Sequence, residues 1–333
     1  MFRVYLDPPL SDSERRERLY RGDILVLSPT TATQALVELA SGMLRDAFHP
    51  HDPRTIHRFR TAAEVAAVLA DLKPRFIHHP ECKEIIPSIL ADSGISIDDV
   101  YFDVPRLRSV YPASFLSAGI AYAYHPHRDT WHSAPMCQIN WWLPVFGLDP
   151  NNAMAFYPRH FSEPVDNNSE IYNYYDWNTE ARPNAAQHIA KDTRTQPKPQ
   201  QELDQLKLSF LPPPAALILF SAAHLHDTTP NSTDMARYSI DFRTVHIDDL
   251  KAGRGAANVD SRCTGTTLRD FLRASDLEHL PADVIGLYDD SSSTNENVVL
   301  YFGERLLSRR ASPGEATDQP PTAQPSPMRR REL

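Results

Sequence analysis

The sequence predicts a mainly β protein with flanking helices, and three observations predict it. In the first hundred residues, apolar side chains recur at helical spacing, most clearly over 33–47 and 62–72. From about residue 100 the pattern changes to short apolar or alternating runs broken by Pro, Asn and Asp, which is typical of strands. The chain also contains 29 Pro against 11 Gly, a balance that suits many short strands with stiff connections. We therefore expect a β-rich core between helical segments.

The expected elements follow in order along the chain. After the two helices above, a shorter helix is expected over 84–90, although Pro87 weakens it. A polar stretch over 163–209 is expected to form a long insertion in the core, and a last helix is expected over 267–274. The expected strands lie at 119–124, 136–145, 153–157, 215–221 and 237–245.

These elements fit one domain over 1–308. It would comprise a mainly helical part (1–99), the β core (100–250) and a C-terminal helical part (251–308). From 309 to 333 the chain is rich in Ser, Pro, Glu, Thr and Gln. Such a composition cannot bury enough apolar surface to order itself, so a disordered tail is expected there.

Charge and cysteine content narrow the class of partner. The net charge is −9 and no basic stripe crosses the body of the chain, which argues against a nucleic-acid partner. No run of about 18 apolar residues exists, so no membrane partner is expected. The first ten residues lack the pattern of a signal peptide, and three widely spaced Cys do not suggest a disulfide framework. We expect a cytoplasmic protein that acts on a small molecule.

A candidate metal motif lies in the segment 124–132, which reads Tyr-His-Pro-His-Arg-Asp-Thr-Trp-His. In an extended strand His125, His127 and Asp129 would point the same way. Two His and one carboxylate leave open positions on Fe(II), and such a site needs a second His from a distant strand. The motif alone is unspecific, because chance predicts about two His-x-acid pairs. The chain has three, the others at His79 and His246.

The sequence that follows each His-x-acid pair distinguishes the three candidates. Only the pair at His127 is followed by an apolar strand, then His226, then Arg237 eleven residues later. His224 would share a strand face with His226 and competes with it as a ligand. The Thr-Thr-Pro-Asn that follows His226 favours His226.

Alternation in the strand after His226 indicates two different faces. Tyr238, Ile240 and Phe242 form an apolar face that would pack against the helices. The opposite face carries Arg237 and Ser239, followed by one acid and a second Arg. A guanidinium on this face could bind a carboxylate through two parallel hydrogen bonds. Alternatively, the polar face could be exposed to solvent, since an edge strand would show the same alternation.

The strand at 136–145 alternates in a similar way. Gln138, Asn140 and Trp142 share one face. In a barrel interior these side chains would contact cofactor or substrate, whereas on an outer face they would be solvated. Trp142 and His125 are candidate substrate contacts, although His125 could equally be a hydrogen-bonded His beside the site.

In these residues the chain resembles the Fe(II)/2-oxoglutarate-dependent oxygenase superfamily, and within it the phytanoyl-CoA dioxygenase-like branch. The resemblance covers roughly residues 120–245. It is carried by His127-Arg-Asp129, His226-Asp-Thr-Thr-Pro-Asn-Ser and Arg237-Tyr-Ser239. One departure lies at 157–160, where the family's usual Pro-Gly-Ser-His element reads Tyr-Pro-Arg-His.

The resemblance implies a double-stranded β-helix, a jelly-roll or cupin-like core of two antiparallel sheets. It also implies that His127, Asp129 and His226 bind Fe(II). Arg237 would bind the distal carboxylate of 2-oxoglutarate, with Ser239 and Thr228 as hydrogen-bonding helpers. Gln138 and Asn140 are further candidates for contact with the cofactor.

The implied reaction uses 2-oxoglutarate and O2 to oxidise a small metabolite, releasing succinate and CO2. Halogenating relatives replace the metal-binding carboxylate with a small residue, so Asp129 favours hydroxylation, desaturation or cyclisation. Two other classes remain open. A binuclear zinc hydrolase could use His125, His127 and Asp129, although that family has a His directly after the Asp and this chain has Thr130. A non-catalytic barrel could bind a small ligand.

Aromatic residues gather in the insertion at 163–209. They would either cap a pocket or pack over the barrel. They are Tyr172, Tyr174, Tyr175 and Trp177.

Overall fold

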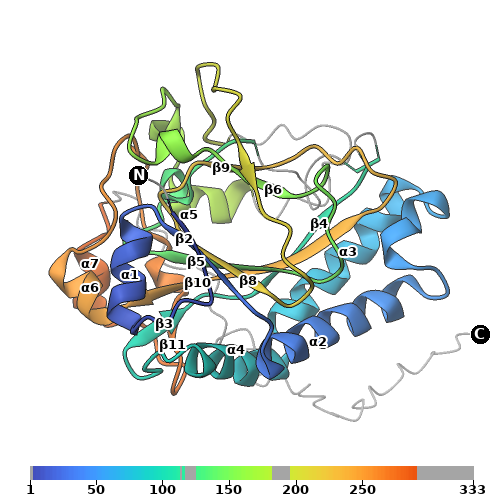
Figure 1. Cartoon of the computed structure of the whole chain (residues 1–333), viewed down its shortest axis with the longest axis horizontal. Helices are drawn as coiled ribbons and strands as arrows, with labels where there is room; N and C mark the ends of the chain where they lie inside the picture. Colours follow the sequence, from blue (N-terminus) through green and yellow to red (C-terminus); the bar gives the residue numbers. More distant parts are fainter. Residues whose placement is uncertain (1–2, 113–114, 117–124, 182–195, 291–333) are drawn as a thin grey trace, which may run out of the picture.

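A computed structural model of the chain describes residues 3–112, 115–116, 125–181 and 196–290. The strand expected at 119–124 and the tail expected at 309–333 lie outside these ranges. Within them, two sheets form the centre of the molecule and helices cover one side (Figure 1).

The larger sheet contains eight strands among the described residues. Its path runs β1-β2-β8-β5-β10-β3-β11, and β4 pairs with β10 beside β3. All of its pairings are antiparallel except that of β1 with β2. The strands are β1 (Val4–Leu6), β2 (Ile24–Leu27), β3 (Val100–Phe102), β4 (Arg106–Val110), β5 (Ile139–Pro144), β8 (Leu217–Ser221), β10 (Arg237–His246) and β11 (Leu272–Arg273).

The smaller sheet lies across from the larger one. Its strands are β7 (Leu208–Ser209), β6 (Met154–Phe156) and β9 (His226–Thr228), paired antiparallel in that order. Apolar side chains of both sheets meet between them, namely Trp142, Ile218 and Phe220 from the larger sheet and Met154 and Phe156 from the smaller one. Side chains of two facing sheets interdigitate in this way in sandwiches and jelly rolls. The predicted fold class, mainly β with flanking helices and a jelly-roll core, is confirmed.

Three long helices cover the outer face of the larger sheet. They are α2 (Thr31–Phe48), α3 (Ala62–Ile77) and α4 (Pro80–Asp92). Thr30 and Thr61 begin the first two with capping boxes, which satisfy the free amide groups of the first turn. Their apolar faces join one core with the outward side chains of the sheet. The sheet contributes Trp141, Leu143, Leu219, Tyr238, Ile240 and Phe242 to this core.

The predicted apolar face of the strand at 237–245 therefore packs against the helices, as expected. Helices over 33–47 and 62–72 are confirmed, and α4 is longer than the predicted 84–90 because Pro87 is accommodated inside it. The helix predicted over 267–274 is wrong. A 3-10 helix, η8 (Thr267–Asp270), ends there and the chain then joins the sheet as β11, opposite Phe102.

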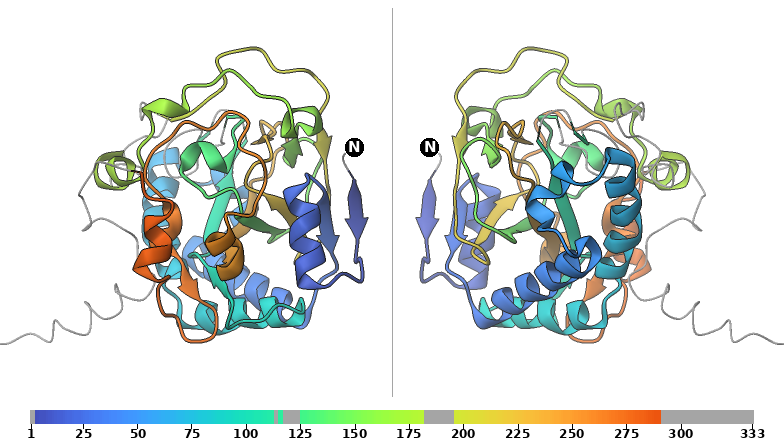
Figure 2. Two further views of the ribbon diagram at one scale, coloured as in Figure 1. Left: turned by 90° about the vertical axis from the view of Figure 1, so that its left-hand side faces the viewer. Right: turned by 90° about the vertical axis from the view of Figure 1, so that its right-hand side faces the viewer.

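Smaller elements close the two ends of the sheets. A second apolar cluster joins η8 to α6 (Ile247–Ala252) and α7 (Ala282–Gly286). The described parts of the insertion lie at the end of the molecule away from α2 and α4 (Figure 2). No helix among the described residues is both long and apolar enough to cross a membrane. The remaining short elements are α1 (Asp12–Tyr20), η1 (Pro53–Arg58), η3 (Asp129–His132), η4 (Pro158–Phe161), η5 (Ser169–Ile171), α5 (Tyr174–Asp176) and the π-helix η6 (Trp177–Ala181).

Candidate metal centre

Three predicted ligands lie together between the two sheets. His127, Asp129 and His226 each present one ligand atom, and these atoms all lie within 4.8 Å of one another. All three side chains are buried, with exposed fractions of 6%, 9% and 8%. The two His rings are 4.4 Å apart between centroids. A pair of His and one carboxylate at these separations is a donor set that fits a divalent metal ion.

The backbone holds both His rings in the same way. His127 and His226 form an isolated antiparallel bridge, with N···O distances of 2.9 and 3.0 Å. The Nδ1 of His127 lies 2.8 Å from the carbonyl of His125, and the Nδ1 of His226 lies 3.0 Å from that of His224. Because a carbonyl only accepts, each Nδ1 carries the proton and each Nε2 presents a lone pair. This arrangement orients metal-binding His rings in proteins.

Asp129 reaches the site from a 3-10 turn instead of the expected strand. The chain leaves the bridge at His127, and Asp129 begins η3. Its Oδ2 accepts a hydrogen bond of 2.7 Å from Nδ2 of Asn140, and Nε2 of Gln138 lies 3.5 Å away. Oδ1 faces Nε2 of His127 at 3.4 Å. One oxygen is thus anchored to β5 and the other points to the histidines.

The surroundings of the site favour an ionised Asp129 carboxylate and a neutral His226 imidazole. Burial would raise the pKa of Asp129, but the nearby Arg243, His127 and His226 hold it well below its usual range. Burial, helped by the charge of His127, lowers the pKa of His226 to about 4. Metal ions bind the deprotonated forms of both side chains, so the site is prepared for a cation at neutral pH.

Gln138 and Asn140 were predicted to contact cofactor, and the structure places both beside Asp129. Nε2 of Gln138 also donates to Oδ1 of Asn140 at 2.9 Å. The Oε1 of Gln138 is buried without a partner. Since both side chains face inward, the alternative of a solvated outer face is wrong for β5.

Arg237 and Ser239 lie on the inner face of β10. Arg237 is 5% exposed, donates from Nη1 to the carbonyl of Asn152 at 3.1 Å, and lies over the ring of Trp142 at 5.7 Å. Its Nε and the Oγ of Ser239 are buried without hydrogen-bond partners. Burial lowers the pKa of Arg237 to about 10, and the charge of Arg108 acts in the same direction. Burying a cation with an unpaired N–H donor costs free energy unless an anion pairs with it.

The other candidates are spread around this interior. Trp142 is buried on the same face as Asn140, and Thr228 is half-buried in β9 opposite Met154. His125 is exposed and is not part of the metal-competent group. The expectation that it shares a strand face with His127 and Asp129 is wrong, because the chain turns into η3 at Asp129.

His224 is fully buried away from the group and serves the fold. Its Nε2 lies 3.1 Å from the carbonyl of Gly22 and its ring packs against Phe161. Of the two competing histidines, only His226 joins His127 and Asp129 in the described structure.

Sequence reasoning assigned no role to three neighbours of the site. Arg243 places Nε 3.7 Å from Oδ2 of Asp129 and donates from Nη1 to Asp103 at 3.0 Å. His132 packs edge-on against His127 at 5.3 Å, and its Nε2 is buried without a partner. Arg128 lies between two predicted ligands, and its side chain is 1% exposed. Of these three, the alternation of β10 had placed Arg243 on the polar face of the strand, without assigning it a contact with Asp129.

The C-terminal segment at 258–267 holds the turn that carries Asp129. Oγ of Ser261 donates to Oγ1 of Thr130 at 2.7 Å, and Sγ of Cys263 contacts the carbonyl of Thr130 at 3.0 Å. Oγ of Ser133 donates to the carbonyl of Thr264 at 2.6 Å. The turn is therefore fixed by contacts that come from more than a hundred residues away in the sequence.

No protein-family model and no curated protein matches this chain. Solved structures of related shape include the apo form of the non-heme monooxygenase ThoJ (13% identity, 66% of this chain and 72% of that chain, TM-score 0.34). EvdO2 from Micromonospora carbonacea var. aurantiaca is 12% identical over 52% of this chain and 62% of its own, with a TM-score of 0.34. The epimerase SnoN in complex with Fe3+, alpha ketoglutarate and nogalamycin RO is 15% identical over 71% and 85%, with a TM-score of 0.39. Likeness at this level does not assign an activity, so the chemistry of the site rests on its own residues.

Proposed function

We propose that this protein is a non-haem Fe(II)/2-oxoglutarate-dependent dioxygenase that oxidises a small molecule. The main support for the proposal is that a candidate metal site and a buried arginine lie in the same interior of the protein. A two-His, one-carboxylate set lies beside the strand β10, and the same inner face of β10 carries the buried, incompletely paired Arg237. Fe(II) in such a set would bind 2-oxoglutarate and O2 and supply the oxidation, with release of succinate and CO2.

The chain's own residues would position the co-substrate. Arg237 offers Nε, and Ser239 offers Oγ, to the distal carboxylate of 2-oxoglutarate. The ring of Trp142 packs against the guanidinium of Arg237, 5.7 Å from its centroid. The hydroxyl of Thr228 is proposed as a further donor to the co-substrate. Burial of these groups strengthens each hydrogen bond to the anion.

Asp129 narrows the reaction type. A carboxylate held by Asn140 fills the position that a halide would need, so we propose hydroxylation, desaturation or cyclisation. The spacing of His127, Asp129, His226 and Arg237 supports placement in the phytanoyl-CoA dioxygenase-like branch. Trp142, and His125 at the edge of the site, are proposed as substrate contacts.

The alternatives make different demands on the same residues. A binuclear hydrolase based on His125, His127 and Asp129 would need His125 in the metal group, and this side chain is exposed outside it. A non-catalytic barrel that binds an anion could use Arg237, but it would have no need for a two-His, one-carboxylate set beside it.

A panel of small metabolites tests the proposal, with succinate formation as the readout in the presence of Fe(II), 2-oxoglutarate and O2. We expect one class of compound to accelerate succinate release in the wild type and none to do so in Asp129→Ala. The mass of the product then separates gain of one oxygen from loss of two hydrogens. A protein that binds zinc and releases no succinate under any condition would overturn the proposal, and so would full activity in Asp129→Ala.

A further inference from the structure

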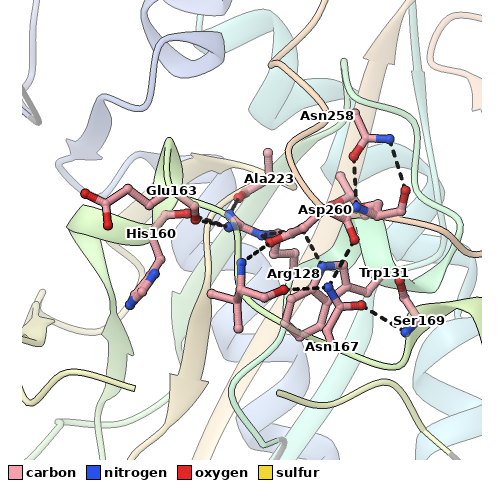
Figure 3. Close-up of polar contacts among 12 residues, drawn as sticks. Arg128, Trp131, His160, Glu163, Asn167, Ser169, Ala223, Asn258 and Asp260 are labelled. Carbon is pink, nitrogen blue, oxygen red and sulfur yellow. Dashed lines mark hydrogen bonds and ion pairs between the residues drawn. The ribbon is translucent and has the colours of Figure 1, made fainter. Parts of the chain in front are cut away.

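Arg128 lies between His127 and Asp129 in the sequence, and its side chain lies in a buried hydrogen-bonding cluster with Asp260 (Figure 3). Its guanidinium pairs with Asp260, with Nε 3.0 Å from Oδ1 and 3.1 Å from Oδ2. Nη1 donates to the carbonyl of Ala223 at 2.5 Å. Nη2 donates to the carbonyls of His160 and, at 3.1 Å, Glu163.

Asp260 collects donors from the same segments. Nε1 of Trp131, in the turn that carries Asp129, donates to Oδ1 at 2.7 Å. The backbone N–H of Val165 donates to Oδ2 at 2.9 Å, and Nδ2 of Asn167 donates to the Asp260 carbonyl at 3.0 Å. Side chains of Arg128 and Asp260 are only 1% and 5% exposed, so the pair is shielded from solvent.

Four segments therefore meet at one buried ion pair. They are the turn with His127 and Asp129, the chain at Ala223 that leads into His226, the segment 160–167 that opens the insertion, and the C-terminal segment around Asp260. The first two carry all three candidate metal ligands. Arg128, Trp131 and Asp260 themselves do not belong to the metal-competent group of the described residues.

We propose that Arg128 and Asp260 are positioning residues of the metal centre: their ion pair holds the His127–Asp129 turn at a fixed distance from His226 and links both to the segment 160–167. The inference rests on the proposed function only in requiring that the three ligands bind a divalent metal. Residues that orient metal ligands without binding the metal themselves typically contribute about ten- to a hundred-fold to metal affinity. By thermodynamic linkage, metal binding must then also restrain the segment 160–167.

The test uses Co2+ as the probe on the full chain, comparing Asp260→Asn and Arg128→Lys with the wild type. A matched control is Asp249→Asn. Asp249 is 1% exposed and also accepts from three donors, on Arg16, Tyr20 and Arg254, but it contacts none of the three ligands. All three variants should unfold at lower temperature. Only the first two should bind Co2+ about ten-fold or more weakly, with an altered visible spectrum of the bound Co2+.

Amide hydrogen exchange supplies a second readout that a general loss of stability would not reproduce. Co2+ should slow exchange over 160–167 in the wild type and in Asp249→Asn, but much less in Asp260→Asn. If Asp260→Asn does not fold, Arg128→Lys carries the same comparison, since it keeps the positive charge.

Two results would overturn the inference. One is wild-type Co2+ affinity and spectrum in Asp260→Asn and Arg128→Lys. The other is an equal loss of affinity in Asp249→Asn, which would show that any destabilised variant binds metal poorly. A wild type that binds no Co2+ would instead overturn the proposed function, so the two failures are distinguishable.

Discussion

Asn140 donates a 2.7 Å hydrogen bond from Nδ2 to Oδ2 of Asp129, and this contact leaves Oδ1 as the oxygen that faces His127. Strand β5 thereby selects which oxygen of the carboxylate is offered to a metal. Removing the amide in Asn140→Ala should free the carboxylate to rotate and weaken divalent metal binding by about ten-fold or more. Titration of the apoprotein with Co2+ measures this.

A matched control lies on the opposite face of the same strand pair. Nε1 of Trp141 donates to Oγ1 of Thr244 at 2.9 Å, on the side that packs against the helices. Thr244→Val should lower the free energy of unfolding without changing the Co2+ affinity. Equal metal affinities in wild type and Asn140→Ala would show that the contact has no role in positioning Asp129.

The two histidines near the end of β8 should respond in opposite ways to substitution. His226→Ala removes a ligand atom and should abolish stoichiometric metal binding. His224→Gln should retain it, because His224 contacts the carbonyl of Gly22 and lies outside the ligand group. The metal content of the two variants after dialysis shows which histidine is the ligand. Metal retained in His226→Ala and lost in His224→Gln would reverse the assignment.

Replacement of Arg237 should act on 2-oxoglutarate and leave metal affinity unchanged. Hydrogen bonds to charged groups contribute about 1.5–3 kcal/mol. Arg237→Met should therefore weaken 2-oxoglutarate binding by about ten- to a hundred-fold. Anaerobic calorimetric titration of the metal-loaded protein measures the affinity. Arg269→Met, which removes an arginine that pairs with Asp289 away from the site, is the control. Unchanged affinity in Arg237→Met would contradict the assigned role.

Acid should destabilise the metal-free protein, in part through His224. Burial lowers the pKa of His224 to about 3 from the ordinary 6.5, although two carbonyls act in the opposite direction. Between these values the unfolded chain binds a proton that the folded chain does not, so stability is present above pH 6.5 and falls as the pH drops below it. At pH 5 the loss from this one group is about 2 kcal/mol.

Urea unfolding at pH 7 and pH 5, with EDTA present, measures this loss. His224→Gln cannot take up a proton, so its stability should fall less between the two pH values than that of the wild type. Identical losses in both proteins would exclude His224 as a source of the acid sensitivity.

Much of the architecture could be predicted because the signals are local. The period of the apolar residues gave α2 and α3, and the alternation of Tyr238, Ile240 and Phe242 gave the face of β10 that packs on the helices. The grouping of His127, Asp129 and His226 followed from spacing and from the Arg that comes after them.

Other features depend on contacts between distant segments and could not be predicted from local pattern. β1 and β2 add to the sheet edge beside β8, and short strands of three and four residues carry little signal of their own. Asp129 turns into η3 because the carbonyl of Ala222 accepts a hydrogen bond from its backbone N–H. The segment 258–267 also holds the turn, since Oγ of Ser261 donates to the neighbouring Thr130. The pairing of Arg128 with Asp260 spans 132 residues. In the sequence, Arg128 is only an arginine between two candidate ligands, and its burial appears only in the structure.

The central claim is that His127, Asp129 and His226 form a metal centre that receives 2-oxoglutarate against Arg237. Binding of 2-oxoglutarate to the wild-type chain, measured anaerobically with and without Fe(II), tests it most directly. The account predicts that one Fe(II) binds per chain. It also predicts that 2-oxoglutarate binds, and produces a metal-to-ligand charge-transfer absorption band, only when Fe(II) is present. Binding that is equally tight without metal, or no binding to the Fe(II)-loaded protein, would contradict it.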